Sequence, residues 1–272
     1  MRTELPELLA IDSHCHADIM NSLVPEFFDT YHRMRVGGIS WSYVEGIKSY
    51  RHYPEYWNRL KELCQRLRQQ GLFFYYLVGI HPRCIPPDLD GTSGLPREVT
   101  ESMLEHLSSP LCLGIGEIGI DTGSEREERI FRLQLEWAEE QVVPGKRVGI
   151  HTPRQNKKDI TRRILDILSY YEPLHPFTVI DHVTPETFPY VHEQGLVAGL
   201  TLQEGKCSKK DLITMLERHG DALKGLMLNS DGARSISKPF FDFICDRSFP
   251  DEELKKGLLR DHCLNFFAIR DR

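Results

Sequence analysis

The sequence predicts an α/β protein in which eight parallel strands close into a (β/α)8 barrel, the TIM-barrel architecture. Its 272 residues fit one such barrel, typically of about 250 residues, better than two domains. Short apolar runs alternate with amphipathic stretches eight times along the chain. Side chains of the metal-binding types follow five of the eight apolar runs. We therefore expect residues 1–272 to form a single domain.

The elements follow from the apolar pattern, because an apolar run of four to eight residues bounded by turns is typical of a buried strand. The predicted strands are residues 8–12, 36–42, 73–80, 111–116, 147–151, 177–181, 196–200 and 225–229. The predicted helices are residues 23–33, 55–70, 97–107, 125–142, 157–171, 185–193, 208–219, 237–245 and 251–268. Gly71 follows a helix as a C′ residue, and Ser208 with Asp211 forms a capping box.

A doubly wound open sheet is the competing fold, but it would not bring residues that follow strands 1, 4, 5, 6 and 8 to one point. Side chains at the C-terminal ends of parallel barrel strands converge on one face. The sequence therefore places a metal centre, with one or two ions, at that face. The long irregular stretch 82–96 should lie on the same face.

Composition limits the class of protein. A net charge of −6 excludes a global basic field for nucleic acid, although local basic patches remain open. The seven cysteines include no CxxC pair and indicate reduced thiols. No apolar stretch approaches the ~18 residues of a membrane span, and the acidic N-terminus lacks signal-peptide features. We expect a cytoplasmic protein without a membrane or an obligatory protein partner.

His14 and His16 are two residues apart at the end of the first strand. In extended backbone, residues i and i+2 point to the same side, so both rings can bind one ion while Cys15 points the opposite way. Two polar residues in a loop are the simpler alternative, and the position at a strand end argues against it.

Glu117 lies in an apolar, glycine-rich run, where an unpaired carboxylate would be costly to bury. A metal removes that cost, and two oxygens allow the carboxylate to bridge two ions; a buried salt bridge is the alternative. His151 and His182 each end a separate apolar run, and neutral imidazole is the commonest metal ligand. Asp231 follows the last strand and can bind an ion or accept a proton from water, or else cap the next helix.

Further residues on the same face are candidates for binding substrate. His81 ends the third strand and either contacts substrate or supports a ligand. Arg154, with Lys157 and Lys158, follows His151 and can receive a phosphate; for the two lysines a solvated helix start is the simpler interpretation. Lys206 is a weaker candidate of this kind.

Together these motifs resemble the TatD-related branch of the amidohydrolase superfamily. The matching stretches, in family order, are residues 12–18, 79–82, 116–121, 150–154, 181–182 and 230–231. The segment 127–139 also resembles the family's helix before strand 5. The resemblance covers most of the chain, and it implies a barrel with one or two divalent ions and a metal-dependent deoxyribonuclease or related hydrolase.

The resemblance also implies roles for individual residues. It implies that His14 and His16 bind one ion and that Glu117 bridges this ion to a second, which His151 and His182 hold. It also implies that Asp231 binds the first ion. Two departures fall in substrate-facing loops. Val183-Thr184-Pro185 stands where nuclease members carry Phe-Ser-Gly, and Asn229-Ser230-Asp231 stands where they carry Glu-Thr-Asp. The chain looks closer to the less characterised archaeal-type members.

The function expected first is a divalent-metal-dependent hydrolase of phosphodiester bonds at a DNA or RNA end, or of a small phosphodiester. Asp231 and Glu117 would be its catalytic residues, and His81 and Arg154 would bind substrate. The alternative is an amidase or lactonase acting on a small molecule, since fold does not fix substrate; a barrel that keeps metals only for structure is a third reading. Histidine with carboxylate suits zinc, and manganese or magnesium is also compatible.

Overall fold

The computed structural model describes residues 8–141 and 145–269 and contains a single sheet of eight parallel strands in sequence order. The strands are β1 (Ala10–Cys15), β2 (Val36–Ser40), β3 (Phe74–Val78), β4 (Cys112–Gly119), β5 (Arg147–His151), β6 (Thr178–Ile180), β7 (Val197–Thr201) and β8 (Met227–Asn229). Each strand pairs in parallel with the next. The predicted (β/α)8 architecture is confirmed.

The sheet closes between β1 and the segment that follows β8. Asp231 N donates to His14 O at 3.0 Å, and His16 N donates to Gly232 O at 2.7 Å. A parallel bridge also joins Cys15 to Gly232. The backbone of three predicted metal ligands therefore forms the seam of the barrel.

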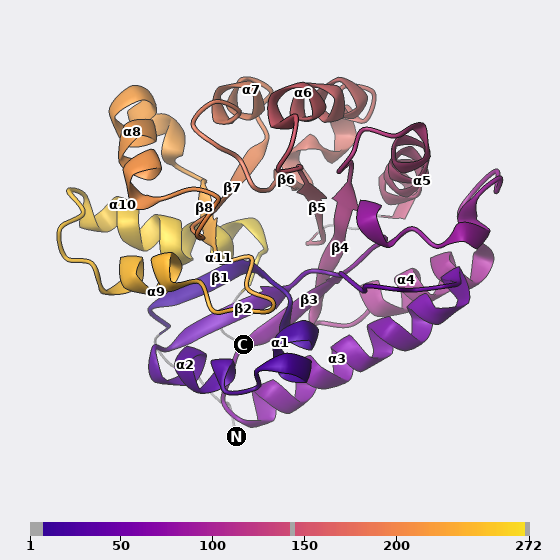
Figure 1. The fold of residues 1–272 in the computed structure, drawn as a ribbon, viewed down its shortest axis with the longest axis horizontal. Coiled ribbons are helices and arrows are strands. Elements are labelled where there is room, and N and C mark those ends of the chain that lie inside the picture. The colour runs from indigo at the N-terminus through magenta and orange to yellow at the C-terminus, as the bar shows by residue number, and fades with distance from the viewer. Residues whose placement is uncertain (1–7, 142–144, 270–272) are drawn as a thin grey trace.

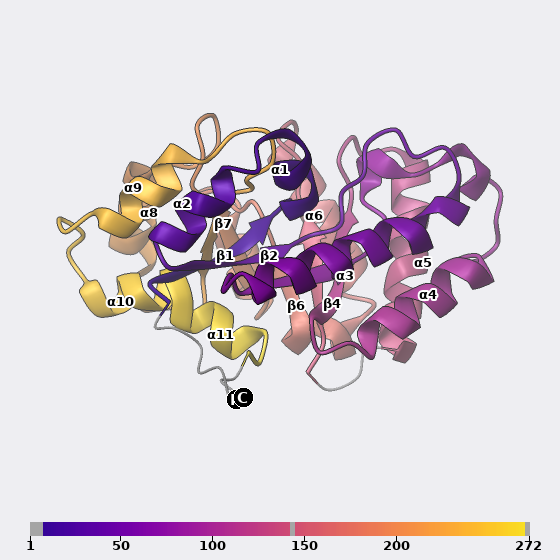
Figure 2. The ribbon, with the colours of Figure 1, turned by 90° about the horizontal axis from the view of Figure 1, so that it is seen from below.

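Helices surround the barrel (Figures 1 and 2). They are α1 (Ala17–Leu23), α2 (Phe27–Arg33), α3 (Tyr53–Gln69), α4 (Arg97–Leu107), α5 (Glu125–Gln141), α6 (Lys157–Leu168), α7 (Phe188–Glu193), α8 (Lys209–His219), α9 (Lys238–Cys245), α10 (Glu252–Lys256) and α11 (His262–Phe266), with a π-helical segment at Gly257–Asp261 between the last two. Figure 2 shows α1 and α11 at opposite ends of β1. None of the helices in the described part of the chain is long and apolar enough to span a membrane.

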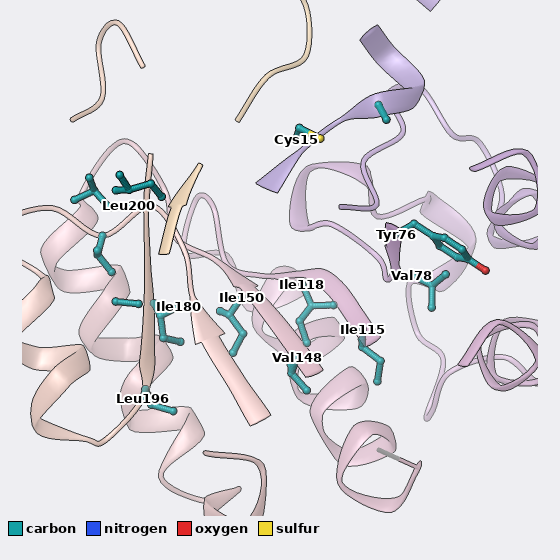
Figure 3. Packing of buried hydrophobic residues seen from close by; sticks show 14 of the residues in the cluster. Cys15, Tyr76, Val78, Ile115, Ile118, Val148, Ile150, Ile180, Leu196 and Leu200 are labelled. Carbon is teal, nitrogen blue, oxygen red and sulfur yellow. The ribbon is translucent and has the colours of Figure 1, made fainter. Parts of the chain in front are cut away.

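The core has two parts, because alternate residues of each strand face opposite sides. The larger part lies between strands and helices, and Figure 3 shows Val78, Ile115, Val148, Ile150 and Ile180 within it. Cys15 belongs to this outer cluster, as its alternation with the flanking histidines predicts. The smaller part fills the barrel interior; Cys263 and Phe267, from α11 and the residue after it, pack there beside Ile11 and Met227.

Several predicted boundaries are wrong for local reasons. The helix predicted at 23–33 begins only at Phe27, because Val24 precedes Pro25 and has φ −149° and ψ 68°, outside the helical region. The preceding helix α1, which ends at Leu23, was not predicted. β1 runs to Cys15 and β4 to Gly119, so His14 and Glu117 lie within strands rather than after them. The helices predicted at 157–171 and 185–193 span 157–168 and 188–193. The capping box at Ser208 is present.

Candidate metal centre

The structure brings the six predicted metal ligands together at the C-terminal end of the barrel. Three groups have ligand atoms mutually within 4.8 Å of one another, and the first two share His14: His14, His16 and Asp231; His14, Asp181 and His182; and His81, Glu117 and His151. All of these side chains are buried except Asp231, which is partly exposed. The strand-end positions therefore produce one compact cluster, as expected for a closed barrel.

The Glu117 carboxylate lies at the middle of this cluster and is 1% exposed. One oxygen, Oε1, lies 2.6 Å from His151 Nδ1, 3.5 Å from His182 Nε2 and 3.6 Å from His81 Nε2. The other oxygen, Oε2, lies 3.2 Å from His14 Nε2 and 3.9 Å from His16 Nε2. Each oxygen thus faces its own set of imidazoles, which is the arrangement a carboxylate needs to bridge two ions.

On the first side, the outer nitrogen of each histidine is held by an acceptor. His14 Nδ1 bonds to the Asp181 carboxylate, and His16 Nδ1 lies 3.1 Å from Trp41 O. Because a carbonyl oxygen only accepts, His16 Nδ1 carries the proton and Nε2 faces Asp231 Oδ1 at 3.2 Å. The His14 ring also stacks on the Trp41 indole, with centroids 4.1 Å apart.

On the second side, His151 Nε2 bonds to Asp121 Oδ1 at 2.9 Å, and His182 Nδ1 to Thr201 Oγ1 at 2.7 Å. His81, predicted to bind substrate, is 2% exposed, and its Nδ1 accepts from Arg83 N at 3.0 Å. Its Nε2 therefore points at Glu117. His81 thus lies against the centre, and it also lines the cavity into which the centre opens.

Two of the predicted ligands sit on unusual backbone. His182 has φ 60° and Asp231 has φ 47°, both in the left-handed region that non-glycine residues rarely adopt. Such conformations cost about 1–3 kcal/mol each and cluster at functional sites. At Asp231 this turn directs the side chain to His16 while its backbone N–H bonds to His14 O.

The electrostatics are those of a site built for positive charge. Burial lowers the pKa of His14, but the Glu117 and Asp181 carboxylates outweigh it and raise the pKa to about 10. Burial opposes charge on Glu117 as well, yet His14, His81 and His151 hold its pKa well below the usual range. Burial and Lys206 lower the pKa of His182 to about 4. The carboxylates therefore attract a positive charge to the space between His14 and Glu117.

These residues fit a divalent metal. Among the described residues, His14 Nε2 is a buried nitrogen without a hydrogen-bond partner, although Glu117 Oε2 lies 3.2 Å away. His16 Nε2, a lone-pair nitrogen in the neutral ring, faces Asp231 Oδ1. Lone pairs on nitrogen and oxygen repel unless a proton or a cation lies between them. Imidazole with carboxylate is a donor set typical of zinc, and it also accepts manganese.

The centre opens into a cavity of about 640 Å³. His16, Glu117, His151, His182 and Asp231 line its floor. Its rim carries the cationic residues Arg83, Arg154, Arg234 and Lys238, with the acidic residues Glu45, Asp121 and Glu204 among them. Lys206 lies deeper, paired with Asp231. Arg154, predicted to bind substrate, reaches this rim, where its Nη2 lies 3.5 Å from Gln203 Oε1.

Several residues of the site were not predicted. Asp121 and Asp181 hold His151 and His14. Lys206, by contrast, was predicted as a weaker phosphate-binding candidate, and it pairs with Asp231 Oδ2. Asp181 precedes His182 and Asp121 follows Glu117 by four residues, but neither spacing reveals a partner on another strand. Two glycines make room: a Cβ at Gly149 would lie 2.5 Å from Trp41, and one at Gly199 would lie 2.1 Å from Asp181 Oδ1.

An eight-stranded parallel barrel with histidines and carboxylates gathered at the C-terminal ends of its strands is the arrangement expected of a metal-dependent hydrolase. The family model described as TatD related DNase matches residues 11–212, and the chain belongs to this family. The matched region contains five of the six predicted ligands, all but Asp231.

The chain is similar to archaeal proteins of this kind. The chain is 26% identical over 228 residues to an uncharacterized metal-dependent hydrolase of Methanocaldococcus jannaschii, covering 81% of this chain and 83% of the relative. The crystal structure of the TatD-like protein from Archaeoglobus fulgidus matches with a TM-score of 0.73 and 28% identity, covering 95% of this chain and all of that one. The similarity to archaeal-type members is thereby confirmed.

More distant structures share the fold alone. Dihydroorotase from Campylobacter jejuni matches with a TM-score of 0.63 at 13% identity, covering 96% of this chain and 83% of the other.

Proposed function

We propose that this chain is a divalent-metal-dependent phosphodiesterase acting on a nucleic-acid end, a deoxyribonuclease of the TatD type. The observation that carries the proposal is the cationic rim directly above a metal-binding floor. Two of its arginines already have acidic neighbours, since Arg234 pairs with Glu45 and Arg83 lies 3.7 Å from Asp121. Arg154 contacts no carboxylate within the described residues, so its guanidinium is available to a phosphate.

The dimensions support a small substrate or a strand end. A cavity of about 640 Å³ falls in the range of about 300–1,000 Å³ found for small-molecule sites. The chain as a whole has a net charge of −6, which provides no general positive field to hold a long duplex. A single-stranded end or a short phosphodiester fits both facts.

Each side chain of the site then has a role. Bound divalent ions supply a water of lowered pKa and polarise the scissile group. Asp231 accepts the proton of the attacking water and returns it to the leaving oxygen. Lys206, which lies against Asp231 Oδ2 and 3.4 Å from His182 Nδ1, neutralises charge that develops there. Arg154 orients the phosphate through its planar fork of donors.

Replacing Arg154 tests the phosphate. We expect Arg154→Ala to lower kcat/KM for a bis-aryl phosphodiester by about 10²-fold, because a charged hydrogen bond contributes about 1.5–3 kcal/mol. Arg154→Lys should recover only part of this, since lysine lacks the bidentate fork. Steady-state kinetics on the phosphodiester and on a neutral ester provide the measurement.

Lys158 offers a matched control. It lies on the same side of the barrel but pairs with Glu186 at 3.0 Å, so Lys158→Ala should leave both substrates unaffected. Metal content should not change in any of these variants. If Arg154→Ala lowered kcat/KM equally for the phosphodiester and for the neutral ester, the result would argue against phosphate recognition by Arg154.

A second candidate is an amidase or lactonase acting on a small molecule. A second cavity of about 480 Å³ adjoins the first. Arg154, His182 and Lys206 line both cavities. Val183, Pro185 and Cys207 also line this second cavity and provide an apolar surface for an organic group. Faster hydrolysis of a neutral amide or lactone than of any phosphodiester would favour this candidate.

A further inference from the structure

A chain of buried polar side chains lies directly beneath the metal centre, inside the barrel. Asp181, Thr201 and Asn229 follow or end the neighbouring strands β6, β7 and β8, and each is at most 1% exposed. Asn229 Nδ2 donates to Asp181 Oδ1 at 2.7 Å. Thr201 Oγ1 lies 2.8 Å from Asn229 Oδ1 and 2.7 Å from His182 Nδ1.

The direction of every bond in this chain follows from Asp181. Its carboxylate accepts from two sides, from Asn229 Nδ2 at Oδ1 and from His14 Nδ1 at Oδ2, and an amide side chain can donate only from its NH2 group. Asn229 must therefore present its NH2 group to Asp181 and its carbonyl oxygen to Thr201. The Thr201 hydroxyl has one proton, which it donates to that carbonyl.

Thr201 Oγ1 is then left with lone pairs only, so it accepts from His182. His182 Nδ1 must carry the ring proton, and Nε2 must carry the lone pair. That Nε2 lies 3.5 Å from Glu117 Oε1. Asp181 acts on His14 in the same sense. Its Oδ2 accepts a hydrogen bond from His14 Nδ1, which leaves Nε2 as the nitrogen that faces Glu117 Oε2 at 3.2 Å.

A competing donor is present but is less well placed. Lys206 Nζ lies 3.4 Å from His182 Nδ1 and would favour a lone pair there. Its closer contact is with Asp231 Oδ2, and Thr201 Oγ1 is nearer to His182 Nδ1 by 0.7 Å, the difference between 3.4 and 2.7 Å. Asp181 Oδ2, 3.4 Å from the same nitrogen, further favours a proton on it.

We propose that Asn229 is a positioning residue which, through Asp181 on one side and Thr201 on the other, holds a proton on Nδ1 of His14 and of His182 and so keeps Nε2 of both rings as the nitrogen that faces the metal centre. The strand-8 motif is where this chain departs from Glu-Thr-Asp, and a glutamate, which only accepts when ionised, would not serve as donor to Asp181. The proposal rests on the metal centre and not on the substrate, so failure of every phosphodiester assay would leave it standing.

The wild-type protein provides the first test. Long-range ¹H–¹⁵N correlation spectra of protein labelled with ¹⁵N-histidine distinguish an Nδ1–H ring, an Nε2–H ring and a charged ring. His182→Gln identifies the signal of His182 by its loss. We expect the Nδ1–H form for His182 in the metal-free protein; an Nε2–H or charged ring would overturn the proposal, whether or not any variant folds.

Variants test the role of the chain itself. Thr201→Val removes the hydroxyl at nearly constant shape, and Asn229→Leu frees that hydroxyl to donate into His182. We expect both to lose the single Nδ1–H form and to weaken zinc binding by about 10–100-fold, the usual cost of disturbing the groups that orient metal ligands. Thr201→Ser keeps the hydroxyl and should retain the wild-type spectrum and affinity.

Zinc affinity is measured by competition with a chromogenic chelator, and thermal unfolding checks that each variant is folded. A folded Asn229→Leu protein with the wild-type His182 signal and unchanged zinc affinity would overturn the role of Asn229. The same result for Thr201→Val would overturn the role of Thr201.

Discussion

Replacing Asp231 with asparagine should lower turnover by about 10²–10⁴-fold, the usual cost of losing a general base. Asparagine keeps the shape and one oxygen facing His16, but it cannot accept a proton at neutral pH. Lys206, His16 and His182 hold the pKa of Asp231 well below the usual range against the effect of burial, which favours the ionised form although a low pKa also makes the carboxylate a weak base. The carboxylate is therefore ionised and ready to accept a proton.

The measurement is kcat for Asp231→Asn together with metal content by mass spectrometry. We expect most of the metal to remain, because His14, His16 and Glu117 are unchanged. Lys206→Met removes the ion pair with Asp231 but keeps the carboxylate. Turnover of Lys206→Met should therefore fall less than turnover of Asp231→Asn. Wild-type turnover in a metal-loaded Asp231→Asn protein would exclude Asp231 from proton transfer.

Glu117→Gln is expected to abolish binding of at least one ion and to reduce activity to background. Glutamine preserves volume but removes the negative charge at the point where five imidazoles converge. The amide of glutamine has one oxygen and one NH2 group. The NH2 group would face His14 or His151 as a donor, so the side chain could no longer bridge two cations. Equilibrium dialysis with zinc, followed by metal analysis, measures the stoichiometry.

Glu204→Gln is a matched control, because Glu204 lines the same cavity but lies away from the cluster of histidines. It should bind the wild-type number of ions. If Glu117→Gln did so too, the carboxylate would not bridge, and the ions would be held by the histidines and Asp231 alone.

The sequence predicts the barrel and the convergence of the six ligands, because both depend on local signals. Each buried strand is an apolar run, and each predicted ligand stands at or near its end. The parallel order of the strands then brings His14, Glu117 and Asp231 together without further information. Alternation along β1 likewise predicts that Cys15 faces the helices.

The supporting residues could not be predicted in this way, because their roles depend on register between strands. Asn229 bonds to Asp181 and Thr201 only because β6, β7 and β8 bring these side chains to one level. His81 illustrates the same limit: its position after β3 was predicted, but its burial against Glu117 depends on how β3 and β4 pair. The start of α2 could have been placed from Pro25, since proline restricts the residue before it, but the predicted helix began at residue 23, before this proline.

A chain still emerging from the ribosome cannot assemble the first ion site until nearly all of it has been made. The barrel seam joins Ser230 to Asp12, which lies 218 positions earlier, and contacts so distant in sequence form late because closing long loops costs entropy. Metal binding should therefore occur at the end of folding and should not accelerate its first steps. In refolding experiments, the visible absorbance of cobalt(II) bound at the centre should rise only with the slowest phase of burial of the barrel core.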